Sequence, residues 1–200
     1  MGRTFLYKSI TAASEGNYKE KGSKFVGYAF PCTSEEGFAE ELKKMKAEHR
    51  TARHHCYAYA FGPDGEEYRA NDDGEPSGTA GRPIHGQIRS FELSDVGIIV
   101  ARYFGGTKLG TSGLIRAYKS AAKDALENAL VIKIELTDKL RISFPTDDTG
   151  AVMRILEKFE ARILDQQYST ESVLLIEVKL MFSEQMRASL GQIPTLKLDP

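Results

Sequence analysis

The sequence has little of several residue types, and each shortage excludes a class of protein. Tryptophan is absent, and only two cysteines, Cys32 and Cys56, occur among 200 residues. Two cysteines are too few for a disulfide framework or a four-cysteine zinc site, so we expect a reducing compartment and no metal. No apolar run reaches the roughly 18 residues of a membrane span, and the first residues lack a signal-peptide pattern. We therefore expect a cytoplasmic protein without a membrane partner.

The chain also has little net charge. Lys and Arg number 27 against 28 Asp and Glu, which gives a net charge of -1 and indicates no polyanionic partner by itself. The distribution is more informative, because no carboxylate occurs between Asp95 and Asp124. The cations inside that interval are Arg102, Lys108, Arg116, Lys119 and Lys123. The sequence therefore contains a local cationic segment.

Apolar periodicity predicts an α+β fold. Phe38, Leu42 and Met45 recur at the one-face spacing of a helix, and Thr33 with Glu36 forms a capping box, so a helix is expected over 34–49. A continuous apolar run at 96–101 is typical of a central strand covered on both faces. Other expected features before residue 136 are strands at 5–10, 24–30 and 57–61, a turn at 15–17, a hairpin from 57–61 to 67–69 and a loop at 71–82.

The pattern changes after residue 135. Strands and helices are expected there in the order β-α-β-β-α-β, which is typical of a ferredoxin-like fold. We place the boundary near residue 136, with one domain over 1–135 and a second over 136–200. No Gly/Ser-rich linker separates them, so we expect the two domains to be held in a fixed relation.

A strand, a glycine loop and a helix follow one another from Arg102 onward. The loop contains Gly105, Gly106 and Gly110, and at least one of the three is expected to have a positive φ. A glycine-rich turn into a helix N-terminus presents free N–H groups and the positive end of the helix dipole, which favour an anion. Thr111 stands where a P-loop has its lysine, so no nucleotide cofactor is expected. The loop is either a contact for phosphate or nucleic acid, or a purely structural turn.

The helix after this loop carries Arg116, Lys119 and Lys123 within a sector of about 60°. Ile115 and Tyr118 are expected on its buried face. The three cations are either a solvated flank or, without local acids, a surface that favours polyphosphate.

Two further clusters attract catalytic interpretations. On a strand, His54 and Cys56 share one face and His55 points the other way, so the three cannot bind one metal ion, and we interpret them as ordinary strand residues. Asp72, Asp73 and Glu75 have the chemistry to hold Mg²⁺, but acids in a turn-rich loop usually face solvent. No common hydrolase signature occurs.

Three long segments follow one another in order and carry a specific resemblance. They are Arg53-His54-His55-Cys56-Tyr57-Ala58-Tyr59, residues 73–84 from Asp73 to Ile84, and residues 102–110 from Arg102 to Gly110, continued by Gly113-Leu114-Ile115-Arg116-Ala117-Tyr118. Together they resemble the IMPACT family, and within it the bacterial YigZ branch. The resemblance covers nearly the whole chain.

The resemblance implies a fold and a field of activity. It implies an amino-terminal domain like the second domain of a small-subunit ribosomal protein and a ferredoxin-like carboxy-terminal domain similar to the last domain of elongation factor G. Both fold types occur in that translocase, so RNA or ribosome association is an attractive analogy, although fold alone does not establish function. Eukaryotic family members regulate translation under amino-acid starvation through an additional amino-terminal domain, for which this chain has no room. The family supplies no catalytic residue, and Arg53, Arg82, Arg102 and Arg116 match its motif positions as binding candidates.

Two principal hypotheses follow. The first is a translation-linked, non-enzymatic protein that contacts RNA or the ribosome through the glycine loop, including Lys108, and the basic helix. The second is an enzyme acting on a phosphorylated or peptide-like small molecule, with the 73–76 loop and Arg102 lining a pocket. A third hypothesis is a scaffold that binds a protein partner. An enclosed pocket joining Glu75, His54 and Gly106 would favour the enzyme, and an open basic face would favour RNA.

Overall fold

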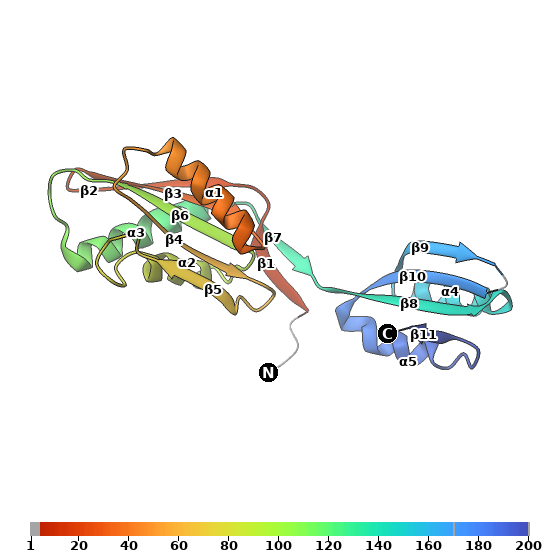
Figure 1. Cartoon of the computed structure of the whole chain (residues 1–200). Coiled ribbons are helices and arrows are strands. Elements are labelled where there is room, and N and C mark those ends of the chain that lie inside the picture. Colours follow the sequence, from red (N-terminus) through yellow and green to blue (C-terminus); the bar gives the residue numbers. More distant parts are fainter. Residues whose placement is uncertain (1–4, 170, 200) are drawn as a thin grey trace. The chain divides into compact units, whose positions relative to one another are not determined.

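The chain folds into two units (Figure 1). Each unit has its own buried apolar side chains. A computed structural model describes residues 5–169 and 171–199. Residues 7–134 form the amino-terminal unit, and the carboxy-terminal unit comprises the described residues from 135 onward together with Phe5 and Leu6. The fold is mixed α+β, as the sequence predicts.

The amino-terminal unit is built on a five-stranded antiparallel sheet of order β2-β3-β6-β4-β5. A separate pair of strands, β1 and β7, forms a second sheet. The elements are β1 (Leu6–Ile10), β2 (Ser14–Glu20), β3 (Ser23–Pro31), α1 (Glu35–Glu48), β4 (His54–Phe61), β5 (Glu67–Asn71), α2 (Gly81–Ser90), β6 (Val96–Tyr103), α3 (Gly110–Glu127) and β7 (Val131–Glu135).

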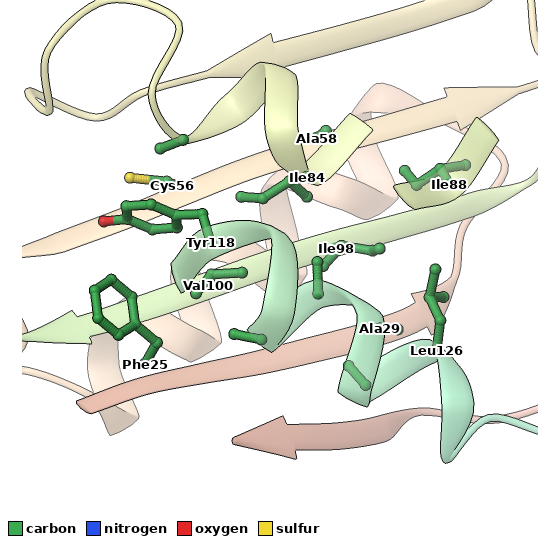
Figure 2. Close-up of a cluster of buried hydrophobic side chains, with 14 of the residues drawn as sticks. Phe25, Ala29, Cys56, Ala58, Ile84, Ile88, Ile98, Val100, Tyr118 and Leu126 are labelled. Atoms are coloured by element: carbon green, nitrogen blue, oxygen red, sulfur yellow. The ribbon is translucent and has the colours of Figure 1, made fainter. Parts of the chain in front are cut away.

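Helices cover both faces of the five-stranded sheet. On the central strand β6, Ile99 packs with Phe38 of α1, whereas Ile98 and Val100 pack with residues of α2 and α3. Figure 2 shows this second cluster, in which Ile84 and Tyr118 lie over the strands. The apolar run predicted as a doubly covered central strand is therefore confirmed.

Helix α3 lies almost directly on the backbone of two strands. A Cβ at Gly16 of β2 would lie 2.1 Å from the backbone nitrogen of Ala125, and one at Gly27 of β3 would lie 2.6 Å from the carbonyl oxygen of Ala121. Glycine on the strands and alanine on the helix make this approach possible. The turn predicted at 15–17 is wrong, because these residues belong to β2.

Other local predictions have mixed outcomes. The helix over 34–49 and the 57–69 hairpin are confirmed, although Ser34 rather than Thr33 caps α1, its hydroxyl accepting from the Gly37 N–H. The loop expected to reach residue 82 ends earlier, because α2 begins at Gly81. Ile115 is 42% exposed, so its assignment to the buried face of α3 is wrong.

The carboxy-terminal unit has the predicted ferredoxin-like order. Its elements are β8 (Thr137–Pro145), α4 (Thr149–Lys158), β9 (Arg162–Tyr168), β10 (Glu171–Lys179), α5 (Leu180–Leu190) and β11 (Lys197–Asp199), with a short 3-10 turn at Thr146–Asp148. The antiparallel sheet has the order β11-β8-β10-β9. Alternate residues of β8 and β10, such as Ile142 and Ile176, pack with Val152 and Leu156 of α4 and Met186 of α5.

Across residues 5–169 and 171–199, none of the helices combines the length and the apolar character needed to span a bilayer.

Candidate functional site

The candidate site lies where the end of the central strand meets the start of α3. Arg102, near the end of β6, pairs in register with Phe25 of β3 on one side and His54 of β4 on the other. Because Arg102 follows Ile98 and Val100 at every second position of β6, its side chain projects from the same face, which carries α2 and α3. The three motif segments meet here although up to 65 residues separate Arg53 from Tyr118.

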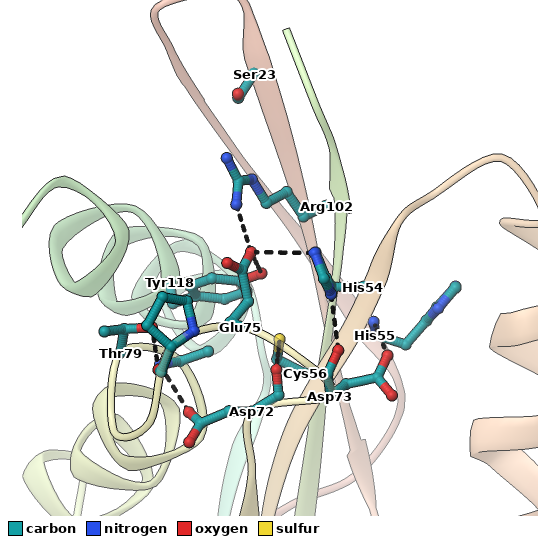
Figure 3. Close-up of polar contacts among 12 residues, drawn as sticks. Ser23, His54, His55, Cys56, Asp72, Asp73, Glu75, Thr79, Arg102 and Tyr118 are labelled. Carbon is teal, nitrogen blue, oxygen red and sulfur yellow. Dashed lines mark hydrogen bonds and ion pairs between the residues drawn. The ribbon is translucent and has the colours of Figure 1, made fainter. Parts of the chain in front are cut away.

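Glu75 is the centre of a buried polar cluster (Figure 3). Its Oε1 accepts hydrogen bonds from Arg102 Nη1 and, at 2.8 Å, from the Tyr118 hydroxyl. The Glu75 side chain is only 4% exposed and that of Arg102 only 8%. A buried carboxylate needs such partners, and here its charge is matched by a guanidinium and a hydroxyl from two separate elements.

His54 is oriented by the loop that follows β5. Its Nδ1 lies 2.7 Å from the carbonyl oxygen of Asp73, which can only accept, so Nδ1 carries the hydrogen. Its Nε2 lies 3.9 Å from Glu75 Oε1. This tautomer leaves Nε2 of the neutral ring as an acceptor next to the buried cluster. His55 lies on the opposite face of β4, as predicted, where burial lowers its pKa below the usual range.

Asp72 organises the loop that carries Glu75. Its carboxylate accepts from the N–H groups of Gly78, Ala80 and Gly81 at 2.8, 3.0 and 2.8 Å. Burial alone would raise the pKa of Asp72, but these three donors hold it below its usual range. The loop is therefore a fixed structure, and two of the three bonds reach the start of α2.

A cavity of about 400 Å³ opens beside this cluster. Its lining residues are Arg53, His54, Glu75, Pro76, Arg102, Phe104, Lys108, Leu109, Gly110, Thr111 and Leu114. We refer to it as the motif pocket, because each of the three motif segments contributes to it. The pocket joins His54 and Glu75 as the enzyme hypothesis requires, but Gly110 rather than Gly106 borders it.

The motif pocket has an excess of positive charge. Its described lining residues include the cations Arg53, Arg102 and Lys108 and one carboxylate, Glu75. The first turn of α3 borders it, and within the described residues no side chain caps that turn and no acid lies in it. An uncapped helix start next to cations favours a bound anion.

The glycine loop adopts the conformations that the sequence predicts. Gly106 and Gly110 have φ values of +88° and +72°, which confirms the expected positive φ. Gly105 serves a different purpose, because a Cβ there would lie 1.9 Å from the carbonyl carbon of Gly22. Its N–H donates to Ser23 Oγ at 3.1 Å, so the loop is attached to the β2–β3 turn.

The structure brings together some predicted binding residues and not others. Arg53, Arg102, Lys108 and Gly110 line the motif pocket, whereas Arg82, Gly105 and Gly106 are not among its lining residues. On α3, Arg116 pairs with Glu20 of β2 and Lys123 lies 3.1 Å from Glu127, while Lys119 is exposed. Two of the three helix cations are thus accompanied by a carboxylate. Glu20 is distant in sequence from Arg116, and Glu127 lies one helical turn after Lys123.

Sequence reasoning missed the polar role of Tyr118, which it placed only in the core. The available signal was a tyrosine on a helix face otherwise made of alanine and leucine, since a buried hydroxyl needs a partner. The Cys56 thiol is buried, which raises its pKa above the usual range, and its Sγ donates to the carbonyl oxygen of Asp72. The part of the chain that the structure describes contains no group of three or more His, Cys, Asp or Glu side chains arranged to hold a metal ion.

Comparisons with known proteins place these features in a family. Residues 21–126 match the model of the Impact N-terminal domain. The chain is 34% identical over 167 residues to the IMPACT family member YvyE of Bacillus subtilis (strain 168), covering 84% of this chain and 74% of that one. It is 28% identical over 162 residues to the IMPACT family member YigZ of Escherichia coli (strain K12), covering 80% and 78%. A crystal structure of a hypothetical protein is similar with a TM-score of 0.71 at 25% identity, covering 97% of this chain and 96% of that one.

Proposed function

Since this chain belongs to the IMPACT family, we propose that it is a translation-linked binding protein that contacts RNA or the ribosome and holds a phosphate group in the motif pocket. The observation that supports this most is the meeting of the three motif segments around one positively charged pocket at the start of α3. Phosphate groups supply most of the contacts of proteins with nucleic acids, and such a pocket offers them N–H groups and cations together.

The pocket cations divide into two roles. Arg53 and Lys108 are exposed and can be reached by a phosphate from outside, with the Arg53 guanidinium lying over the Phe104 ring, whereas Arg102 is buried and fixed by Glu75. We expect Arg53 and Lys108 to supply most of the phosphate affinity. Long-range attraction of the phosphate groups then comes from the cations Arg82, Arg116, Lys119 and Lys123. This attraction is weaker where a carboxylate accompanies the cation.

The test is binding to purified ribosomes and to ribosomal RNA fragments over a series of salt concentrations. The double variant Arg53→Gln, Lys108→Gln removes two phosphate contacts, so the slope of log K against log salt should fall by about 1.4 for single strands to about 1.8 for duplexes. Lys43→Gln is the matched control, because Lys43 is an exposed cation on α1, across the sheet from the pocket. Equal slopes for the double variant and the control would contradict the proposal.

A second candidate function is an enzyme acting on a phosphorylated or peptide-like small molecule. The position of His54 Nε2 at the pocket, next to Glu75, favours it, because a neutral imidazole acceptor can serve as a general base. Glu75 itself is already engaged by Arg102 and Tyr118, so His54 would carry this role. The enzyme hypothesis requires that a ligand of the pocket is turned over. His54→Gln should abolish this turnover while the ligand still binds. If the parent protein binds a ligand without turning it over, the enzyme hypothesis is excluded for that ligand.

A further inference from the structure

We propose that the motif pocket is selective for a phosphomonoester carried by a single nucleoside, either at the end of an RNA strand or as a free mononucleotide, over an internal phosphodiester. This inference rests on the proposed function insofar as it assumes that the pocket takes a phosphate group. It goes further by naming which phosphate and what is attached to it.

The charge of the pocket matches a dianion. Three cations and one carboxylate among its described lining residues leave an excess of two positive charges. A phosphomonoester carries about -1.5 to -2 charges at pH 7 because its second pKa is about 6, whereas an internal phosphodiester carries one. The start of α3 adds its dipole at the same place. A terminal phosphate therefore gains more from this pocket than a phosphate within a strand.

One donor inside the pocket wall lacks an acceptor. Arg102 is buried, and its Nε is among the buried side-chain atoms for which the described residues supply no hydrogen-bond partner. Only part of the guanidinium is therefore satisfied by Glu75. A buried donor without a partner is costly, so an oxygen-rich anion that enters the pocket and draws the guanidinium toward it would relieve that cost.

The remaining walls suit a nucleoside rather than bare phosphate. Phe104, Leu109, Leu114 and Pro76 form the apolar part of the lining. The Arg53 guanidinium lies over the Phe104 ring, 4.8 Å from its centroid, and both aromatic rings and guanidinium planes are surfaces on which bases stack. A cavity of about 400 Å³ falls in the range of small-molecule sites, which excludes a duplex and admits one unpaired nucleotide.

Calorimetry and fluorescence anisotropy on the full chain test this selectivity with four probes. The probes are a six-nucleotide RNA with a 5′-phosphate, the same RNA with a 5′-hydroxyl, AMP, and inorganic phosphate. We expect the phosphorylated RNA to bind at least tenfold more tightly than the hydroxyl form, and AMP to compete with it. Measurable binding of both RNAs with equal affinity, or failure of AMP to compete with bound RNA, would overturn the inference.

The same probes distinguish an RNA end from a free nucleotide as the source of the phosphomonoester. They also distinguish failure of this inference from failure of the proposed function. Phosphorylated RNA binding more tightly than AMP identifies an RNA end, and AMP binding at least as tightly identifies a free nucleotide. Ribosome binding without any preference for a terminal phosphate would refute this inference and leave the proposed function standing. Tight AMP binding with no affinity for RNA or ribosomes would refute the proposed function and support the phosphomonoester pocket.

Variants of two pocket residues, Lys108 and Phe104, locate the effect. Lys108→Gln should reduce the preference for the 5′-phosphate at least fivefold, whereas Lys43→Gln should leave it unchanged. Phe104→Leu should weaken AMP binding and leave inorganic phosphate unaffected, because it removes the stacking surface only. If circular dichroism shows that Phe104→Leu folds poorly, Phe104→Tyr takes its place. This variant keeps an aromatic ring and should retain AMP binding, and together with Lys108→Gln it tests whether the motif pocket is the site. A preference that survives Lys108→Gln would overturn the assignment to this pocket.

Discussion

Arg102 on the central strand and Glu75 in the loop before α2 form an ion pair in which both side chains are less than a tenth exposed. The pair joins the second motif segment to the third at the motif pocket. Tyr118 donates to the same carboxylate, so the middle of α3 is tied to it as well. The pair therefore connects the elements that line the pocket, and Glu75 reduces the positive charge of the pocket by one.

Replacing Glu75 by glutamine should have opposite effects on stability and on anion binding. Breaking a buried ion pair by neutralising one partner costs about 3 kcal/mol or more, because the remaining charge is left buried without compensation. The same change raises the excess positive charge of the pocket, so phosphate affinity should increase in the folded variant. Urea unfolding and phosphate titration measure the two effects.

Glu67→Gln is the control for this variant, because Glu67 is an exposed carboxylate on the edge strand β5. We expect it to change neither quantity appreciably. If Glu75→Gln were as stable as the parent protein, the ion pair would not be a structural centre of the site.

Two glycines of the loop before α3, Gly105 and Gly106, should respond differently to alanine. Gly106 has a positive φ and open space around it, so Gly106→Ala should cost about 1 kcal/mol through backbone strain alone. Gly105→Ala should cost about 3 kcal/mol, because its Cβ would collide with the backbone of Gly22 and that backbone must move. Thermal unfolding of both variants tests the order, and a Gly105 variant at least as stable as the Gly106 variant would contradict the close approach.

The carboxylate of Asp72 should make stability depend on acid pH. Its pKa is lowered in the folded state, so its contribution is present above the unfolded-state pKa of about 3.9 and is lost as the pH falls through the lower, folded-state value. Asp72→Asn should lower the free energy of unfolding by about 1 to 2 kcal/mol at pH 7, because the amide can no longer accept all three N–H groups. The variant should also lose part of the decrease in stability below pH 4, and an unchanged pH profile would show that Asp72 does not contribute it.

Local sequence patterns predicted the elements whose signal lies within a few neighbouring residues. The apolar run of β6 and the glycine loop before α3 are both where the sequence places them. Helix α2 was missed because Ala80, at its N-cap, provides no side-chain cap. The missing cap comes from Asp72, eight residues earlier, and such a contact has no local signature.

The same limit applies to charge. The absence of carboxylates between Asp95 and Asp124 predicts an uncompensated basic segment, yet Glu20 pairs with Arg116 from 96 residues away. The pocket likewise depends on a histidine interpreted as an ordinary strand residue. His54 became recognisable only when the fold placed the carbonyl of Asp73 at its Nδ1.

The helix cations should therefore contribute less than their number implies. The triple variant Arg116→Gln, Lys119→Gln, Lys123→Gln should fold normally, because glutamine has a helix propensity close to that of lysine and arginine. Three free phosphate contacts would lower the salt slope by about 2.1 for single strands, and we expect a smaller change because Glu20 and Glu127 already accompany two of the cations. A full reduction would show that nucleic acid displaces both carboxylates.

Phosphate binding at the start of α3 can be observed directly by nuclear magnetic resonance. In a titration of the labelled full chain with 5′-phosphorylated RNA, the backbone amide signals of Gly110 and Thr111 and the side-chain Nε–H signal of Arg102 should shift together along one saturation curve. The amide of Lys43, across the sheet, should stay in place. Binding of the RNA with no movement of the Gly110, Thr111 and Arg102 signals would contradict the assignment of the motif pocket as the phosphate site.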